Sequence, residues 1–262
     1  MILKTPAKLN LSLAIEGRDG QGYHLLRTVM QAIDLYDTLT FLPGRGLTLT
    51  GSGEGLAMDE SNLVYRAAAL FYREAGLSPA VRIDLQKAIP TRAGLGGGSG
   101  NAAGTLFALN ERHGKPFSPE RLAALALALG ADVPFFLQGG RALAQGRGER
   151  LTALPVEREA YLLLMNAPGV DTGAAYRAYD EAPGGGFDND LTGPVCRLCP
   201  AVAQDLRRLR TAAGNAHLTG SGACCFARLP GVAQAQEAAR RLGGGKFLAV
   251  ARPIEGAFLW ED

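Results

Sequence analysis

The chain has 262 residues, of which 47% are hydrophobic, and its mean hydropathy is +0.04. These values are typical of a globular protein with a substantial core, and they exclude a largely disordered chain. Since 27 Lys and Arg residues against 25 Asp and Glu residues give a net charge of only +2, the charge predicts no binding to nucleic acid or to a membrane surface.

The sequence contains no membrane-spanning or secretory pattern that we recognise. The longest apolar run near the start, residues 9–15, is interrupted by polar residues and is too short to cross a bilayer. Cys196-x-x-Cys199 has half the spacing of a zinc site, but the adjacent Cys224 and Cys225 do not complete it. We therefore expect a cytoplasmic protein with four reduced, mostly buried thiols.

The first predicted element is a strand over residues 7–15, where apolar and polar side chains alternate. Ala7 and Leu9 fall on one face, and Lys8 and Asn10 fall on the other. The second face has two explanations. It is either an ordinary solvated surface, which is the commoner case for such residues, or it directs Lys8 and Asn10 at a ligand.

A turn over residues 17–22 leads to Tyr23 and His24 and then to an apolar segment over residues 25–35. A single histidine in such a position is more often structural than functional. Further strands are predicted over residues 37–42 and 47–50, separated by a Pro-Gly pair. Ser61 is predicted to begin a helix that ends at Gly76.

The most informative segment follows a predicted strand over residues 81–85 and precedes a predicted helix over residues 102–112. It reads Pro90, Thr91, Arg92, Ala93, Gly94, Leu95, Gly96, Gly97, Gly98, Ser99, Gly100. A glycine loop between a strand and a helix turns backbone N–H groups and the positive helix end toward an anion. A flexible surface turn is the alternative, although such turns seldom concentrate glycines between two strongly patterned elements. The loop lacks the Lys of a Walker P-loop and the last glycine of the dinucleotide fingerprint.

A carboxylate, Asp132, stands between a predicted Ala- and Leu-rich helix over residues 121–129, which we expect to be buried, and the pair Phe135-Phe136. Ser118 and Pro119 are predicted to begin that helix. A buried carboxylate needs a partner. From the pattern alone, a helix cap and a functional role explain Asp132 equally well.

The segment 145–148 is predicted to be a turn between two halves, so we expect domains at residues 1–150 and 151–262. The second half is predicted to begin with a core strand over residues 161–165. A loop through Thr172 then leads to a helix over residues 173–179 that carries Tyr176. The remaining predicted elements are a helix over 202–210, a glycine turn over 217–223, a strand over 224–227, a helix over 234–242 and a strand over 247–250.

The glycine loop resembles the motif P-x-x-x-G-L-G-G-G-S-x-N-A-A of the galactokinase, homoserine kinase, mevalonate kinase and phosphomevalonate kinase superfamily. Four further motifs make the chain similar to one family within it, the 4-diphosphocytidyl-2-C-methyl-D-erythritol kinases. They are Pro6-Ala7-Lys8-Leu9-Asn10-Leu11, Gly22-Tyr23-His24, Gly130-Ala131-Asp132-Val133-Pro134-Phe135-Phe136 and Leu218-Thr219-Gly220-Ser221-Gly222-Ala223. Two departures stand out: Gln21 replaces the usual Asp before Gly-Tyr-His, and Gly100 replaces a second Ser.

The resemblance implies an α+β protein with an N-terminal ATP-binding domain that contains a left-handed crossover, and a ferredoxin-like second domain. It also implies transfer of phosphate from ATP, with Mg²⁺, to a hydroxyl of the cytidine diphosphate substrate in the non-mevalonate isoprenoid route. In that family's pattern, Lys8 and Asp132 are catalytic, Pro90–Gly100 bind ATP, and Ser99 lies near the metal. The substrate would contact Asn10, Tyr23, His24, Thr172 and Tyr176, with the two tyrosines clamping the cytosine.

Two alternatives remain at this point. Another kinase of the superfamily, acting on homoserine or mevalonate, would share the loop but would not need Tyr23, His24 and Tyr176 around a pyrimidine. A nucleotide-binding relative without turnover would not need Lys8 and Asp132 together. The sequence predicts no oligomeric state.

Overall fold

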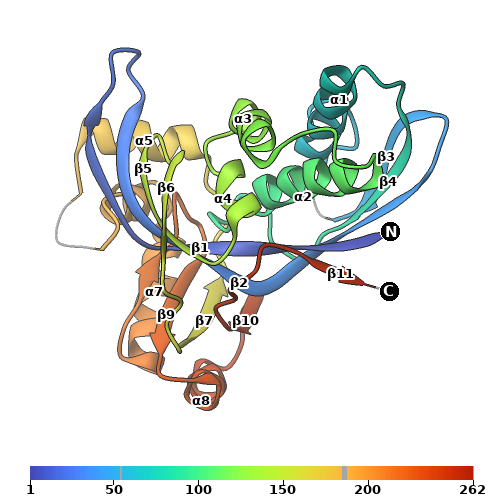
Figure 1. The fold of residues 1–262 in the computed structure, drawn as a ribbon. Coiled ribbons are helices and arrows are strands. Elements are labelled where there is room, and N and C mark those ends of the chain that lie inside the picture. The colour runs from blue at the N-terminus through green and yellow to red at the C-terminus, as the bar shows by residue number, and fades with distance from the viewer. Residues whose placement is uncertain (54, 185–187, 262) are drawn as a thin grey trace.

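The computed structural model describes residues 1–53, 55–184 and 188–261. The described chain forms two separate sheets that share a core, and each sheet is covered by helices (Figure 1). The strands are β1 Ile2–Arg18, β2 His24–Pro43, β3 Gly46–Ser52, β4 Ala80–Gln86, β5 Arg141–Gly146, β6 Arg150–Leu154, β7 Ala160–Met165, β8 His217–Leu218, β9 Cys225–Leu229, β10 Phe247–Ala251 and β11 Leu259–Glu261. The helices are α1 Leu63–Ala75, α2 Gly97–Arg112, α3 Pro119–Leu129, α4 Val133–Gln138, α5 Thr172–Glu181, α6 Thr192–Leu198, α7 Pro200–Ala213 and α8 Val232–Leu242.

The first sheet has seven strands in the order β11-β1-β2-β4-β3, with β5 pairing with β2 and β6 pairing with β5. Among the paired strands of this sheet in the described residues, β3 and β4 form the one parallel pair, and α1 connects them. Helices α1 to α4 lie together over one face of this sheet (Figure 1). The left-handedness expected for the crossover stays a prediction.

The second sheet has the order β10-β7-β9-β8, and its paired strands are antiparallel. Along the chain, β7 is followed by helices α5 to α7, then by β8 and β9, then by α8 and β10. This β-α-β-β-α-β succession is the ferredoxin-like arrangement. The ferredoxin-like second half expected from the resemblance is therefore confirmed.

Strand β1 is buried on both faces, which decides the question of its polar face. Ala7 and Leu9 pack into the same core as Leu163 and Phe226 of the second sheet. Asn10 on the opposite face is also buried, as is Lys8. The alternation alone favours a solvated face for Lys8 and Asn10, and this prediction is wrong. Strand β1 is covered by the second sheet on one face and by the glycine loop and α2 on the other.

Several expected element boundaries are wrong. The segments predicted as separate over residues 25–35 and 37–42 form one strand, β2, because β1 pairs with it along most of its length. Helix α2 begins at Gly97 rather than at residue 102. Asn62, not Ser61, caps α1, since its side chain accepts a hydrogen bond from the N–H of Val64. Helix α3 is only partly buried, and Leu127 on its outer side is 45% exposed.

The turn expected between the two halves lies within the first sheet. Residues 147–149 connect β5 and β6, which pair with each other from Arg141 to Leu154. Strand β11 from the end of the chain also returns to the first sheet and pairs with β1. The division at residue 150 stays a prediction, although the first sheet draws on residues from both sides of it.

The thiols agree with the expectation from spacing. All four cysteines are free; Cys224 and Cys225 are buried, and Cys196 and Cys199 are half-buried. Among the described residues, we find no cluster of three or more metal-ligating side chains. None of the helices in the described ranges is both long enough and apolar enough to cross a membrane.

Candidate active site

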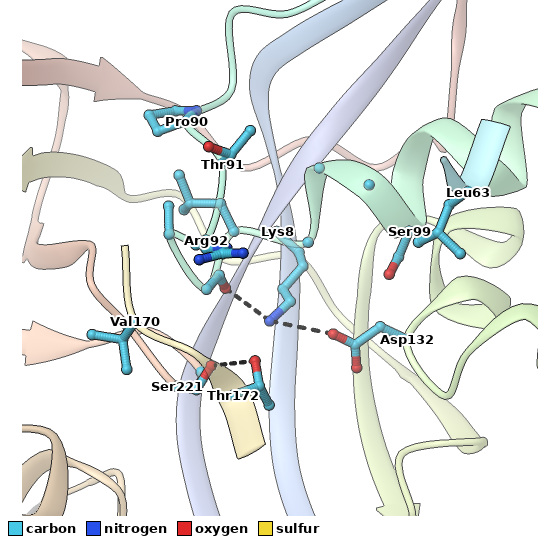
Figure 2. A pocket seen from close by; sticks show the side chains of 18 of the residues that line it. Lys8, Leu63, Pro90, Thr91, Arg92, Ser99, Asp132, Val170, Thr172 and Ser221 are labelled. Atoms are coloured by element: carbon cyan, nitrogen blue, oxygen red, sulfur yellow. Dashed lines mark hydrogen bonds and ion pairs between the residues drawn. The ribbon is translucent and has the colours of Figure 1, made fainter. Parts of the chain in front are cut away.

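A cleft of about 690 Å³ opens where the glycine loop meets the loops of the second sheet. Its walls include β1, β2, the segment before α1, the end of β4, the loop before α2, the residues directly before α4, the start of α5 and the turn over residues 220–222. Figure 2 shows Lys8 at the centre of this cleft, with Arg92 and Thr172 on one side and Ser99 and Asp132 on the other. The structure therefore brings together most of the residues that the sequence predicted as site residues.

Lys8 is the centre of the polar contacts. Its side chain is only 4% exposed, and its Nζ donates to the carbonyl of Gly94 at 3.0 Å and to Oδ1 of Asn10. The same Nζ lies 3.6 Å from Oδ2 of Asp132. A buried ammonium is tolerated only where such partners replace its water. The cleft thus holds a fixed positive charge beside a carboxylate.

Asp132 stands directly before α4, but its side chain makes no capping hydrogen bond. The helix-cap explanation of this carboxylate is therefore wrong. Its side chain is 36% exposed and faces the cleft (Figure 2). A bound hydroxyl group can reach the carboxylate, whereas Lys8 behind it stays shielded from water.

Asn10 was expected to contact substrate, but its side chain forms hydrogen bonds with other residues of the protein. Its Oδ1 accepts from Lys8, and its Nδ2 donates to the hydroxyl of Thr28 at 2.8 Å, which in turn donates to the carbonyl of Ser12. The backbone N–H of Asn10 donates to the hydroxyl of Thr219 at 2.9 Å. Asn10 therefore holds the ammonium of Lys8 in place. A substrate contact by Asn10 stays a prediction.

The glycine loop is fitted tightly against its surroundings. The N–H of Lys8 donates to the carbonyl of Leu95 at 2.9 Å, which ties the loop to β1. Gly94 and Gly96 have φ angles of 75° and 69°, and a Cβ on Gly94 would lie 2.2 Å from the carbonyl oxygen of Thr219. Glycine is required at both positions because of these angles and contacts.

The same loop leaves the start of α2 open to the cleft. The N-cap residue, Gly96, has no side chain to cap this helix, and Gly98 in its first turn is exposed. The first N–H groups of a helix lack intrahelical partners, and they carry the positive end of the helix dipole. The start of α2 is therefore suited to bind an anionic group that enters the cleft.

A buried ion pair lies next to the start of α2. No pattern in the sequence indicated this pair. Lys87 pairs with the fully buried Asp37, whose other oxygen accepts from the N–H groups of Ala88 and Ile89 at 2.8 and 2.9 Å. A Cβ on Gly97 would lie 2.8 Å from Nζ of Lys87. The ion pair therefore packs directly against Gly97, the first residue of α2.

The three aromatic residues expected around a pyrimidine do not meet as a sandwich. His24 stacks on Tyr176 with ring centroids 4.7 Å apart, and its Nε2 lies 2.8 Å from the Asp180 carboxylate. Tyr23 is 58% exposed, and Arg147 lies 4.0 Å above its ring centre. Tyr176 lines the cleft, whereas Tyr23 and His24 are not among its lining residues. The clamp formed by both tyrosines stays a prediction.

Nearby charges and burial change the acidity of this region. The hydrogen bond from Arg18 and, to a smaller extent, the one from His24 hold the pKa of Asp180 below its usual value. Burial, followed by the nearby charge of Asp132, raises the pKa of the Tyr176 hydroxyl. The Tyr176 phenol is therefore neutral at physiological pH, and it lines the cleft.

The structure explains why Gln21 can replace the usual Asp before Gly-Tyr-His. Oδ1 of Asp19 accepts from the N–H groups of Gln21 and Tyr23 at 2.9 and 3.0 Å, and its Oδ2 pairs with Arg147. Burial acts to raise the pKa of Asp19, but Arg147 and these N–H groups outweigh it and lower the pKa. Asp19 thus orders the turn from two positions upstream.

Thr172 and Ser221 complete the wall on the side of the second sheet. Their hydroxyl oxygens are 2.9 Å apart (Figure 2). The motif around Ser221 was recognised in the sequence, but no role for Ser221 was expected. The contact joins the start of α5, which carries Tyr176, to the turn that borders the glycine loop.

Comparison with known proteins places this geometry in a family. Residues 62–140 match the family model described as the GHMP kinases N terminal domain. A 4-diphosphocytidyl-2-C-methyl-D-erythritol kinase from Deinococcus radiodurans is 42% identical over 261 positions, covering 90% of this chain and 87% of the relative. One from Moorella thermoacetica is 40% identical and covers 92% of this chain and 93% of the relative. This chain belongs to the 4-diphosphocytidyl-2-C-methyl-D-erythritol kinase family.

Solved structures agree with this membership. A crystal structure of 4-(cytidine 5'-diphospho)-2C-methyl-D-erythritol kinase matches with a TM-score of 0.82 and 35% identity, covering 97% of this chain and 99% of that chain. The mevalonate kinase of Methanococcus jannaschii matches with a TM-score of 0.72 at 16% identity, covering 97% and 98% of the two chains. The second likeness shows the shared fold alone.

The open start of α2 yields a prediction about Gly98. A Cβ at this position would lie at an ordinary contact distance of 3.5 Å from Leu63 Cδ1, and Gly98 is exposed, so the backbone has room for a side chain in Gly98→Val, which also has a better helix propensity than glycine. The added side chain would obstruct an anion at the N–H groups, and we expect triphosphate affinity to fall by on the order of tenfold or more, equal to about 1.4 kcal/mol. Titration calorimetry with ATP measures the affinity, and thermal unfolding without nucleotide measures the stability.

Gly97→Val is the matched comparison, because its Cβ would lie 2.8 Å from Nζ of Lys87 and 3.0 Å from Ile89. This variant should lose thermal stability as well as affinity. Undiminished ATP affinity in Gly98→Val would show that the phosphates bind elsewhere.

Proposed function

We propose that the protein transfers the γ-phosphoryl group of ATP to a hydroxyl of 4-diphosphocytidyl-2-C-methyl-D-erythritol, a reaction of the non-mevalonate isoprenoid route. Relatives that bear the name of this kinase are 36–42% identical to the chain over most of its length. The single observation that carries the proposal is the Lys8–Asp132 pair, with its 3.6 Å separation, at the centre of the cleft. It argues for turnover rather than for nucleotide binding alone.

The two charges have complementary tasks in phosphoryl transfer, which depends mainly on positioning and charge stabilisation. The half-exposed Asp132 carboxylate can accept a hydrogen bond from the acceptor hydroxyl and take its proton as the hydroxyl attacks. The shielded Lys8 ammonium lies 3.6 Å from that carboxylate and is placed where it can offset charge on the transferring group. Because Asn10 and the Gly94 carbonyl hold Lys8, its ammonium does not have to move during the reaction.

The opening of α2 is the proposed cradle for the triphosphate. Of the residues present, the hydroxyl of Ser99 and the Asp132 carboxylate are oxygen donors on one side of the cleft (Figure 2) and would suit Mg²⁺. Since no cluster of three ligating side chains occurs in the described part of the chain, phosphates and water would complete the ligands. When bound, Mg²⁺ would neutralise charge on the phosphates.

The cytidine end of the substrate is proposed to bind at Tyr176 and His24, with Tyr23 and Thr172 nearby. The support is that Tyr176 and Thr172 line the cleft and that His24 stacks on Tyr176 beside it. Cytoplasmic localisation is part of the same proposal, because the reaction uses ATP and a small soluble metabolite.

A steady-state assay tests the proposed function. Purified protein is given ATP, Mg²⁺ and one acceptor at a time: the cytidyl substrate, homoserine or mevalonate. We expect turnover with the cytidyl substrate and at least a hundredfold lower kcat/KM with the other two, since each lacks the cytidine that would supply about 3 kcal/mol of binding energy. Preference for homoserine or mevalonate would contradict the proposal, and so would ATP binding without turnover of any acceptor.

The role of Tyr176 yields a separate prediction. Stacking of a base on an aromatic ring is worth roughly 1–3 kcal/mol, so Tyr176→Ala should raise KM for the cytidyl substrate about ten- to hundredfold. KM for ATP should stay unchanged, and Tyr176→Phe, which keeps the ring, should behave like the wild type. If Tyr176 serves only the core, the Ala variant will instead lose several kcal/mol of stability and bind both substrates less well.

A further inference from the structure

The cations in the cleft are not equivalent. Four positively charged side chains line it, namely Lys8, Lys87, Arg92 and Arg147. Three of them face a carboxylate: Asp132 for Lys8, Asp37 for Lys87 and Asp19 for Arg147. Arg92 takes part in none of the ion pairs found between described residues. Of the four cationic side chains that line the cleft, Arg92 is therefore the one without a carboxylate partner among the described residues.

The backbone of Arg92 is held in an unusual conformation. Its φ is 51°, a left-handed value that costs energy for residues other than glycine or asparagine. Its carbonyl accepts from the N–H groups of Val170 and Ala223, both at 3.2 Å, so two loops of the second half hold it. Since glycine or asparagine would adopt this backbone more easily, the conformation gives no reason for an arginine. The side chain is therefore the part of Arg92 that could give it a role.

The side chain is placed by contact with Gly169. A Cβ on Gly169 would lie 2.4 Å from Cβ and 3.4 Å from Cδ of Arg92, so the stem of the arginine lies directly over this glycine. Figure 2 shows the guanidinium inside the cleft, on the side of Lys8 opposite Asp132. The guanidinium of Arg92 thus points into the cleft, where each of the other three cations is already paired with a carboxylate.

We propose that the Arg92 guanidinium binds a phosphate group of a substrate in the cleft. Guanidinium groups form paired, charge-assisted hydrogen bonds with phosphate oxygens. The inference rests on the proposed function, in which two such groups are available: the triphosphate of ATP and the diphosphate of the acceptor. It assigns a side-chain role to a position in a loop whose glycines otherwise act through their backbone.

Three substitutions at Arg92 test the proposal. Arg92→Asn and Arg92→Gly remove the charge while suiting the left-handed backbone, so thermal stability should stay the same or rise. Arg92→Lys keeps the charge. Affinity for ATP is measured by calorimetry, and KM is measured for ATP and for the cytidyl substrate. Arg158→Asn, at an exposed position outside the cleft lining, is the matched control.

We expect the uncharged variants to bind one substrate about tenfold more weakly, with the lysine variant between them and the wild type. A weakened ATP affinity assigns the contact to the triphosphate, and a raised KM for the cytidyl substrate alone assigns it to the diphosphate. The affected constant should also depend less on salt in Arg92→Asn than in the wild type, which a purely structural role would not produce. Unchanged constants in both uncharged variants would overturn the proposal.

Gly169→Ala provides an independent check on how the arginine is placed. Its Cβ would collide with Arg92, so it should weaken the same constant in the wild-type background and have much less effect in Arg92→Gly. Equal losses in both backgrounds would overturn the seating of Arg92 on Gly169. If the wild type turns over no acceptor, the proposed function fails, whereas the calorimetric measurement with ATP still tests Arg92.

Discussion

The burial of one ammonium group constrains the whole centre of this molecule. Lys8 has almost no contact with water, so its charge must be compensated by the protein. The compensation comes from three separate elements: Asn10 on the same strand, the Gly94 carbonyl in the glycine loop, and Asp132 before α4. Displacing any one of them leaves a buried charge with too few partners, which is costly. The glycine loop and the Asp132 carboxylate are thereby fixed relative to each other.

The cleft exists because β1 and β2 belong to two cores at once. One face of β1 packs with the second sheet, while residues such as Leu3 and Met30 pack with the helices of the first. Loops from both halves therefore end beside Lys8. Hydrogen bonds from Ala223 and Cys224 to the carbonyls of Arg92 and Ala93 join the two halves across the glycine loop. A movement of either half would therefore displace the residues around Lys8 and Asp132.

Alternation and capping residues predicted most strands and helices, because those signals are local. The start of α2 could not be predicted this way, since its glycines have poor helix propensity. They are present because the helix lies against β1: a Cβ on Gly100 would come within 2.8 Å of the Pro6 carbonyl oxygen. The motifs identified Lys8 and Asp132 by resemblance, and the structure brings them together. In contrast, Lys87 and Asp37 are 50 residues apart, and neither stands in a recognisable motif.

In the proposed reaction Lys8 and Asp132 act as one unit, and a double-mutant cycle measures this coupling directly. The variants are Lys8→Met, Asp132→Asn and their combination, assayed for kcat with ATP and the cytidyl substrate after circular dichroism has shown that each is folded. Each single variant should lower kcat by on the order of a hundredfold or more, and the double variant should be little worse than the poorer single one. Losses that multiply in the double variant, or a nearly normal kcat in either single variant, would contradict the account.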